Sequence, residues 1–123
     1  MREIKFRGKR VDNGEWVYGF FVGYSAAEGY IYGDYIDKNE VWKVDTNSVG
    51  QYIGQKDELG EDIYDGDILH TNEADWIAQV LYHYDGFMLT GLDHTGFSCS
   101  PDYDKCKVIT NKIDHPELIK NDN

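Results

Sequence analysis

GQYIGQKDELGEDIYDGD, residues 50–67, is the stretch from which the architecture of this chain can be read. Its glycines and aspartates stand between short apolar pairs at the spacing of tight turns. Asp57-Glu58-Leu59-Gly60 fits a hairpin loop in which the aspartate opens a type I turn and the glycine takes the left-handed position. Asp65-Gly66 predicts a second tight turn shortly after it. Two chain reversals this close together indicate an all-β domain.

Strand patterns extend from this stretch toward the N-terminus. Residues 3–7 alternate polar and apolar side chains, and Asn13-Gly14 supplies two residues suited to the positive φ angles of a type I′ turn. The strongest strand pattern covers residues 16–24, where one face carries Trp16, Tyr18, Phe20, Val22 and Tyr24. Gly19 and Gly23 lie on the opposite face, which favours close approach of another segment there.

Further strands are expected on both sides of the quoted stretch. Before it and into it, the patterns predict strands at 30–36, 40–45 and 49–53, with turns at 37–39 and 45–48. From its end onward they predict strands at 63–64, 67–70, 77–84, 87–92 and 106–109, with a type I′ turn at Asp85-Gly86 and a loop at 95–104. We expect one short helical turn at 114–119, with Asp114 as its cap and Pro116 in its first turn.

The composition agrees with a small β protein. A chain of 123 residues makes one domain, or one domain with a small appended subdomain. Ten Tyr, five Phe and three Trp favour strands over helices. The sequence contains no run of about 20 apolar residues that would span a membrane, and its start lacks the apolar region of a signal peptide. Two cysteines make no disulfide framework. We therefore expect a cytoplasmic protein with free thiols and no membrane contact.

The net charge of −11 argues against a groove that follows the phosphates of a nucleic acid. The charge is uneven, because residues 1–10 carry five basic side chains and one acidic one, whereas residues 57–75 carry eight acidic side chains and no Lys or Arg. Such polarity favours self-association of the positive end with the negative end. The alternative is that these charges simply fill solvent-exposed faces and hairpin tips.

A single combination of basic and aromatic residues stands out. Lys5 and Arg7 fall on the polar face of the first strand, and Trp16 and Tyr18 follow on the next. This combination is a candidate surface for a partner, either a protein or a nucleic acid whose bases stack on the rings. The structural alternative is a charged edge strand that deters aggregation.

Residues 50–69 resemble the signature of the YopX family, a group of small proteins encoded by bacteriophages and prophages. The family pattern is approximately Gly-Gln-Tyr-x-Gly-x-Lys-Asp-x-x-Gly-x-x-Ile-Tyr-x-Gly-Asp-Ile. The matching residues here are Gly50, Gln51, Tyr52, Gly54, Lys56, Asp57, Gly60, Ile63, Tyr64, Gly66, Asp67 and Ile68. The opening (Ile4-Lys5-Phe6-Arg7 and Trp16-Val17-Tyr18-Gly19) and the tail (His115-Pro116-Glu117-Leu118) match as well. Ser48 stands where the family more often has Thr, and it keeps the hydroxyl group.

The resemblance implies a mostly β fold with a small SH3-type barrel in its C-terminal part. It also implies a setting in the cytoplasm of a phage-infected or lysogenic bacterium, and it offers no catalytic residues to carry over. The signature itself reads as structural, because Asp57, Asp65 and Asp67 suit hydrogen bonds to turn amides and the rings of Tyr52 and Tyr64 suit a cross-strand pair. The functional alternative is a recognition face made of Gln51, Tyr52, Lys56, Asp57 and Tyr64.

No pattern of catalysis or metal binding emerges. The acidic run fails the spacing of a calcium loop from every starting position. The histidines stand far apart, and six residues separate Cys99 from Cys106 against two to four in zinc sites. Nucleophile and phosphate-binding motifs are missing too. We therefore predict no catalytic residue, no metal ligand and no cofactor.

The sequence thus predicts an all-β protein in three parts. Residues 1–48 form an N-terminal antiparallel meander that packs with an SH3-like, partly open barrel at 49–110, and residues 111–123 form a C-terminal tail. The favoured function is a non-enzymatic accessory protein that binds a protein partner or assembles with itself. The alternatives are a nucleic-acid or nucleotide-binding barrel and a small hydrolase that uses carboxylates.

Overall fold

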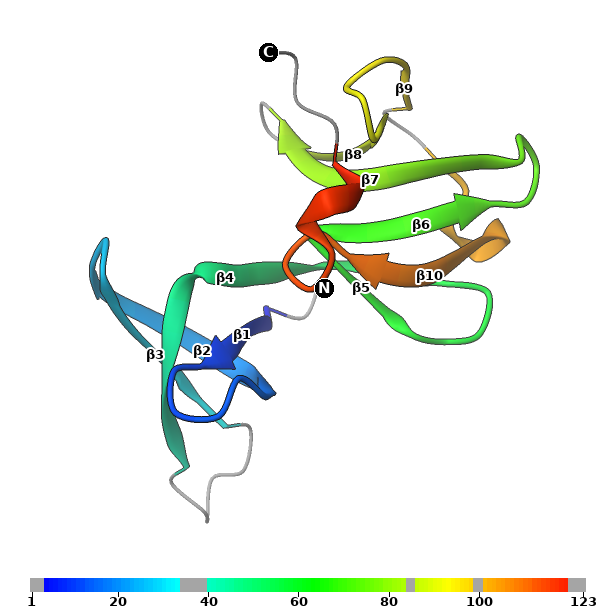
Figure 1. Ribbon diagram of the computed structural model, residues 1–123. Coiled ribbons are helices and arrows are strands. Elements are labelled where there is room, and N and C mark those ends of the chain that lie inside the picture. Colours follow the sequence, from blue (N-terminus) through cyan, green and yellow to red (C-terminus); the bar gives the residue numbers. More distant parts are fainter. Residues whose placement is uncertain (1–3, 34–39, 84–85, 99–100, 120–123) are drawn as a thin grey trace. The chain divides into compact units, whose positions relative to one another are not determined.

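The computed structural model describes residues 4–33, 40–83, 86–98 and 101–119, and of His83 it describes the backbone alone. The fold is all-β, as predicted, and its sheets are antiparallel (Figure 1). The strands are β1 (Phe6–Arg10), β2 (Trp16–Ser25), β3 (Glu28–Tyr32), β4 (Val41–Lys56), β5 (Asp62–Tyr64), β6 (Asp67–Thr71), β7 (Trp76–His83), β8 (Gly86–Gly91), β9 (Phe97–Ser98) and β10 (Cys106–Asn111). Two three-residue 3₁₀ helices complete it, η1 (Tyr103–Lys105) and η2 (Pro116–Leu118). In the described part of the chain, no helix has the length and apolar character to cross a membrane.

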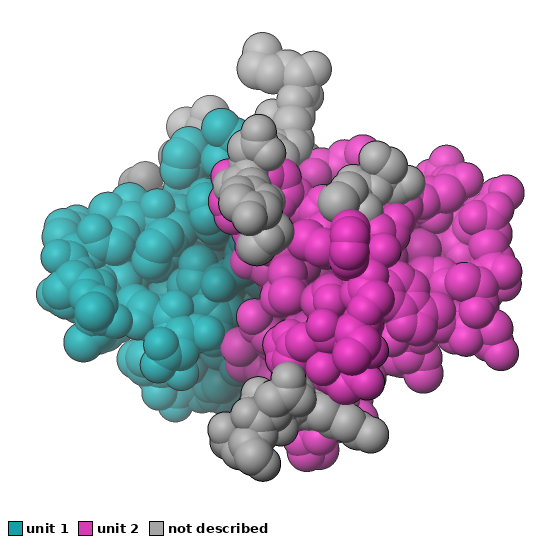
Figure 2. All heavy atoms as spheres, turned by 90° about the horizontal axis from the view of Figure 1, so that it is seen from above, with its two compact units in different colours: residues 1–52 teal, residues 53–123 magenta. Residues whose placement is uncertain are grey.

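The chain divides into two compact units, residues 1–52 (unit 1) and residues 53–123 (unit 2), which Figure 2 colours separately. The division falls within β4, so one strand belongs to both units. The boundaries predicted from sequence, after residues 48 and 110, separate three structural parts of one unit and stay a prediction.

In unit 1 the predicted meander closes on itself. β1, β2, β3 and β4 are successive antiparallel neighbours, and β1 also pairs with β4, so four strands form a ring. Inside the ring lie Val17, Ile31 and Val44, with Phe6, Phe21, Trp42 and Val49 packed against them. β1 spans Phe6–Arg10, so it begins and ends later than the predicted strand at 3–7. The strand continues past Arg7 because Gly8, the next inward-facing residue, is buried. A Cβ at Gly8 would lie 3.2 Å from both Ile31 Cδ1 and Val44 Cβ, so the core leaves little room for a side chain at this position.

The close approach predicted at the glycines of β2 is confirmed at Gly19. A Cβ at this position would stand 2.0 Å from the carbonyl oxygen of Tyr32, which is closer than any side chain can pack. Val17 and Gly19 are buried and Phe21 is packed against the core. The predicted aromatic face of β2 therefore points outward.

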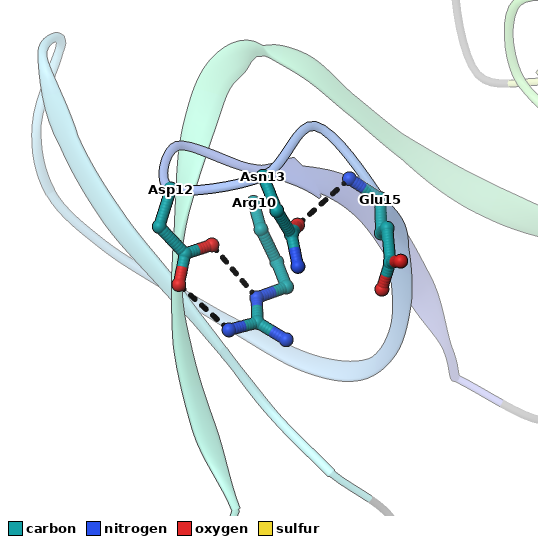
Figure 3. Close-up of polar contacts among 4 residues, drawn as sticks. All are labelled: Arg10, Asp12, Asn13 and Glu15. Atoms are coloured by element: carbon teal, nitrogen blue, oxygen red, sulfur yellow. Dashed lines mark hydrogen bonds and ion pairs between the residues drawn. The ribbon is translucent and has the colours of Figure 1, made fainter.

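The β1–β2 connection differs from the predicted type I′ turn. Gly14 has a positive φ of 73°, but Asn13 does not, and the loop has four residues between Arg10 and Glu15 rather than two. The Gly14 amide donates to the Arg10 carbonyl at 2.9 Å. The Asn13 side chain accepts from the Glu15 amide at 2.9 Å (Figure 3). The asparagine thus acts through its side chain, as an Asx turn, and not through a left-handed backbone.

The turn predicted at residues 45–48 is also wrong, because β4 runs through it without interruption. Between the pairs Arg7↔Gly50 and Lys9↔Asp45, one residue of β1 faces four residues of β4, which makes a wide bulge. Ser48 fills the gap in the ladder: its hydroxyl accepts from the Lys9 amide at 2.8 Å and donates to the Asp45 carbonyl at 2.6 Å. The polar cluster that resembles a turn in the sequence is therefore a bulge held by its own side chains.

Unit 2 contains an open sheet in the order β10-β6-β7-β8-β9. Its core consists of Ile53, Ile63, Leu69, Ala78, Val80, Leu89 and Cys106. The hairpin at Asp57–Gly60 is confirmed, with the Gly60 amide bonded to the Asp57 carbonyl at 3.0 Å and Gly60 at a φ of 82°. The turn at Asp65-Gly66 joins β5 to β6, also as predicted.

Three details of unit 2 correct the sequence reading. The loop predicted at 95–104 contains β9 and η1. The C-terminal helical turn exists as η2, but its cap is His115 instead of Asp114, which bonds back to Asn111. Gly86 pairs with His83 as the first residue of β8, so it lies in a strand and not in the predicted turn, whereas Asp85 lies outside the described residues. The predicted turn at 37–39 and the ends of the predicted strands at 30–36 and 77–84 lie outside the described residues, as does Cys99.

Candidate functional site

The signature residue Asp57 organises the hairpin between β4 and β5. Its Oδ1 accepts from the amides of Leu59 and Glu61, both at 2.9 Å, and its Oδ2 accepts from the Val108 amide of β10 at 3.0 Å. Burial alone would raise the pKa of this carboxyl, since only 5% of the residue is exposed, but the bonds from the Val108, Glu61 and Leu59 amides outweigh it and lower the pKa. A carboxylate engaged in this way joins the hairpin to β10, so its role is structural.

The remaining signature residues divide between the two units. Gln51 and Tyr52 belong to unit 1, whereas Lys56, Asp57 and Tyr64 belong to unit 2. Tyr52, Asp57 and Tyr64 are 6%, 5% and 4% exposed, which leaves little for a partner to contact. Lys56 is exposed and pairs with Asp62 at 2.5 Å. The burial favours the structural reading of the signature over a recognition face; the cross-strand pairing of Tyr52 with Tyr64 stays a prediction.

Of the second predicted group, the structure brings Arg7, Trp16 and Tyr18 together on β1 and β2, whereas Lys5 lies over the ring of Tyr52. Arg7 pairs with Tyr18 and Lys9 pairs with Trp16 across β1 and β2. The Arg7 guanidinium lies 4.6 Å and the Lys9 ammonium 5.3 Å from the centre of the Trp16 ring, and Lys5 lies 5.0 Å from that of Tyr52. Cations over ring faces at these distances are attracted by the ring quadrupole. Arg7 is only 8% exposed, so its place is beneath the tryptophan and not in a partner's reach.

The outer face of β2 and β3 holds the largest exposed aromatic row of unit 1. Tyr18, Phe20 and Tyr24 are 46%, 62% and 63% exposed, and Tyr32 is 37% exposed. Phe20 stands opposite Tyr32, and Val22 stands opposite Tyr30, so the row continues from one strand to the next. We call the outward residues Tyr18, Phe20, Val22, Tyr24, Tyr30 and Tyr32 the aromatic face.

The aromatic face ends in a groove of about 290 Å³ lined by Tyr24, Glu28, Tyr30, Tyr32 and Val41. The Tyr30 hydroxyl donates to Glu28 Oε2 at 2.8 Å. The rings of Tyr24 and Tyr30 meet edge to face with their centres 5.6 Å apart. The carboxylate of Glu28 thus lies beside three tyrosines near the turn that joins β2 to β3.

Sequence reasoning missed this site, although a signal for it was present. Alternation separates the two faces of β2, but of the aromatic side chains that share one face only Trp16 and Tyr18 become candidates, because they adjoin the basic strand. Gly19 marks the face that a neighbouring backbone approaches, since a Cβ there would stand 2.0 Å from the carbonyl oxygen of Tyr32. Phe21 on that face packs against the core, and the aromatic side chains of the other face point outward. The sequence pattern does not, however, indicate that Glu28 lies beside these aromatic side chains.

Unit 2 holds a second concavity, of about 140 Å³, whose lining includes Thr71, Trp76, Leu89, Lys105 and Cys106. Burial and then the nearby carboxylate of Asp102 raise the pKa of the Cys106 thiol to about 11. A thiol of this pKa stays protonated at neutral pH and is a poor nucleophile. Cys106 is 1% exposed and packs in the core, so its place is that of a small apolar side chain.

Two of the histidine side chains that the structure describes lie beside carboxylates. His70 lies 2.8 Å from Asp75, and His115 lies 3.3 Å from Glu117. Within the parts of the chain that the structure describes, His, Cys, Asp and Glu side chains do not gather in threes as they would around a metal ion. The expected lack of a cofactor stays a prediction.

Comparisons with known proteins bear on the whole chain. The model of the family described as YopX protein matches residues 5–120. The crystal structure of protein EF1440 from Enterococcus faecalis superposes with a TM-score of 0.61 at 20% sequence identity, over 98% of this chain and 100% of that one. At this identity the likeness concerns the fold alone. No curated protein matches the chain.

Proposed function

This chain belongs to the YopX family, and from that premise we propose that it is a non-enzymatic accessory protein of a bacteriophage or prophage. It acts in the cytoplasm of the bacterial host by binding a partner protein. In this proposal unit 2 is an SH3-type, partly open barrel that serves as a scaffold, and unit 1 carries the binding surface.

The observation that supports this proposal is the exposure of the aromatic face. Four aromatic side chains of one sheet face are 37% to 63% exposed, on a unit whose buried core has three members. Exposed apolar patches of this kind mark interaction surfaces, and aromatic residues are enriched where proteins bind each other. Side chains this exposed add little to the stability of the unit that carries them, so a partner is the better explanation.

The test is cross-linking in the bacterial host from a photoreactive residue. Phe20 is replaced by p-benzoylphenylalanine in one variant, and Tyr82 of unit 2 is replaced in the control, because Tyr82 is also exposed, at 57%. After irradiation we expect a protein adduct from position 20 and none from position 82. If position 20 gives no adduct, the proposal is wrong.

A second candidate, a nucleic-acid-binding barrel, is favoured by one observation. Lys9 lies over the half-buried ring of Trp16, and aromatic side chains beside cations can stack bases and follow a backbone. It predicts binding of single-stranded DNA or RNA at low salt that is lost when Lys5 and Lys9 are both changed to Glu. No binding at low salt would eliminate it.

A further inference from the structure

The groove at the end of the aromatic face has the composition of a site for a cation. Its lining consists of three tyrosine rings, one carboxylate and one valine, all from β2, β3 and the start of β4. Ring faces attract cations through their quadrupole, and tyrosines gathered around a cationic group are a known means of recognition. The lining therefore joins two independent features that favour positive charge.

The rings are held in place and remain accessible. Tyr24 packs edge to face on Tyr30, with the ring centres 5.6 Å apart, and a hydrogen bond also joins Tyr24 to Tyr32. Tyr24 is nevertheless 63% exposed, and Tyr32 is 37% exposed. These contacts fix the rings relative to each other, so a ligand would find the surface already formed and would lose little entropy in ordering it.

The carboxylate of Glu28 is held against the same rings. It accepts the Tyr30 hydroxyl through Oε2, at 2.8 Å. An ionised carboxylate offers about four lone-pair sites on two oxygens, so this one bond leaves it able to accept more. The bond to Glu28 also raises the pKa of Tyr30, and the bond to Tyr24 raises that of Tyr32, so both hydroxyls stay neutral across the physiological range.

Elsewhere in the ring of four strands, basic side chains of the chain itself already lie over an aromatic side chain. There Arg7 and Lys9 of β1 lie over Trp16 of β2. At the groove, the basic residue of the neighbouring strand is Lys43, which stands opposite Tyr30 in the ladder but does not line the groove. Among the described residues that line the groove, none is basic, so the rings there lack the cation that Trp16 has.

We infer that the groove formed by Tyr24, Glu28, Tyr30 and Tyr32 binds an arginine side chain of the partner protein. The guanidinium lies on the tyrosine rings and donates to the Glu28 carboxylate. Arginine fits better than lysine, because its planar, weakly hydrated guanidinium stacks on aromatic rings and matches a carboxylate with two parallel donors. This inference rests on the proposed function, and it names the side chain through which the partner is recognised.

The test uses NMR titration of the isotope-labelled full chain with a short peptide, acetyl-Gly-Arg-Gly-amide. The matched control peptide contains citrulline, which has nearly the shape of arginine but no charge. We expect the arginine peptide to shift the amide signals of residues 24–32, with a dissociation constant in the millimolar range, and the citrulline peptide to bind several-fold more weakly. Equal binding of the two peptides, or no shift in this segment with either, overturns the inference.

Two variants locate the contacts. Glu28→Gln removes the charge and Tyr24→Leu removes a ring, and each is expected to weaken binding of the arginine peptide about threefold, as for single exposed ion-pair and cation–ring contacts. Tyr82→Leu in unit 2 is the control and is expected to bind unchanged. The backbone amide spectra of all variants show whether each one is folded. Unchanged affinity of folded Glu28→Gln and Tyr24→Leu proteins would contradict the inference.

Failure here is distinguishable from failure of the proposed function. If position 20 cross-links to a partner in the host but the groove does not bind the arginine peptide, the proposed binding surface is supported and the proposed arginine contact is wrong. If neither is found, both are wrong.

Discussion

The two units differ in the core that they bury. Among the described residues, unit 2 buries a cluster of seven, including Leu89 with 0% exposure. Unit 1 buries three described residues in its central cluster and leaves Phe20 and Tyr24 largely exposed. Unit 2 exposes large side chains too, among them Tyr82 and Phe97, but its core is the larger one. Since burial is what stabilises a fold, unit 2 is the better candidate for a scaffold and unit 1, with its continuous aromatic row, for a binding surface.

Charge divides in the same place. Residues 1–52 carry seven basic and eight acidic side chains, whereas residues 53–123 carry five basic and fifteen acidic ones. Nearly all of the net charge of −11 thus belongs to unit 2. A negative field of this kind speeds the approach of a basic partner and weakens as salt is added. The whole-chain charge says little about the unit that carries the candidate surface.

The largest effect is expected from Leu89→Ala in the core of unit 2. Leu89 has 0% exposure, and truncation of a buried leucine leaves a cavity that costs about 3 kcal/mol. Urea unfolding, followed by amide hydrogen exchange in each unit, measures this loss. The same experiment sharpens the contrast between the units: if unit 1 keeps its protection while unit 2 loses it, the two fold independently. A loss below about 1 kcal/mol in unit 2 would show that its core is not the main support.

The next largest effect is expected from Asp57→Asn. The asparagine can keep one acceptor for the Leu59 and Glu61 amides, but its NH₂ group would face the Val108 amide, donor against donor. One buried amide then lacks a partner, which costs about 2 kcal/mol at pH 7. Urea unfolding of the variant measures the cost, and Asp104→Asn, at an exposed position, serves as the control with no expected loss.

The pH dependence of this difference follows from the lowered pKa of Asp57. The carboxyl is ionised more readily in the folded than in the unfolded state, so its contribution is complete above the unfolded pKa of about 3.9. It is lost as the pH falls through the lower pKa of the folded state. The gap between wild type and Asp57→Asn should therefore narrow below about pH 4. A gap that is equally wide at pH 7 and pH 2 would contradict the role given to the charge.

The sequence predicts a turn where an aspartate and a left-handed glycine close it, and fails where a polar cluster fits either a turn or a bulge. The Asp57–Gly60 hairpin is confirmed because much of what specifies it is local: Asp57 accepts from the Leu59 and Glu61 amides, and Gly60 takes the left-handed conformation. The cluster at 45–48 is misread as a turn, because Asp45 and Ser48 form their hydrogen bonds within a bulge. At the β1–β2 loop, Asn13 acts through its side chain and not through a left-handed backbone, so the loop is not the predicted type I′ turn. Polar clusters alone do not distinguish a turn from a bulge, since the choice depends on which strand lies opposite.

The candidate site is less predictable than the fold. The outward phase of β2 follows from alternation, but the groove needs the pairing of Val22 with Tyr30 and the position of Glu28, which only the three-dimensional register supplies. The closing of the ring by β1 and β4 is equally non-local. Contacts between strands far apart in the chain depend on the packing of the whole unit, so they cannot be predicted from a short sequence pattern.

A smaller effect is expected at the bulge of unit 1, from Ser48→Ala. The hydroxyl bridges the Lys9 amide and the Asp45 carbonyl, and it is 3% exposed, so its loss removes two bonds that water does not readily replace. We expect unit 1 to lose about 1 kcal/mol of stability, measured by hydrogen exchange of β1 and β4 amides. Ser48→Thr keeps the hydroxyl and should restore most of the loss. If Ala and Thr behave alike, the bulge is held by the backbone alone.

The smallest effect on stability is expected from Phe20→Thr on the aromatic face, and it decides most about function. Phe20 is 62% exposed, and threonine suits a strand as well as phenylalanine does, so only the cross-strand contact with Tyr32 is lost. The free energy of unfolding should therefore fall by no more than about 0.5 kcal/mol, as measured by urea unfolding. Cross-linking from a photoreactive residue placed at Tyr18, beside position 20 on the same face, should by contrast be strongly reduced in the variant. If replacing Phe20 leaves the free energy of unfolding nearly unchanged but removes the cross-link, Phe20 belongs to a binding surface. A fall in the free energy of unfolding of more than about 1.5 kcal/mol would mean that the aromatic row supports unit 1, and the contrast between the units would then be wrong.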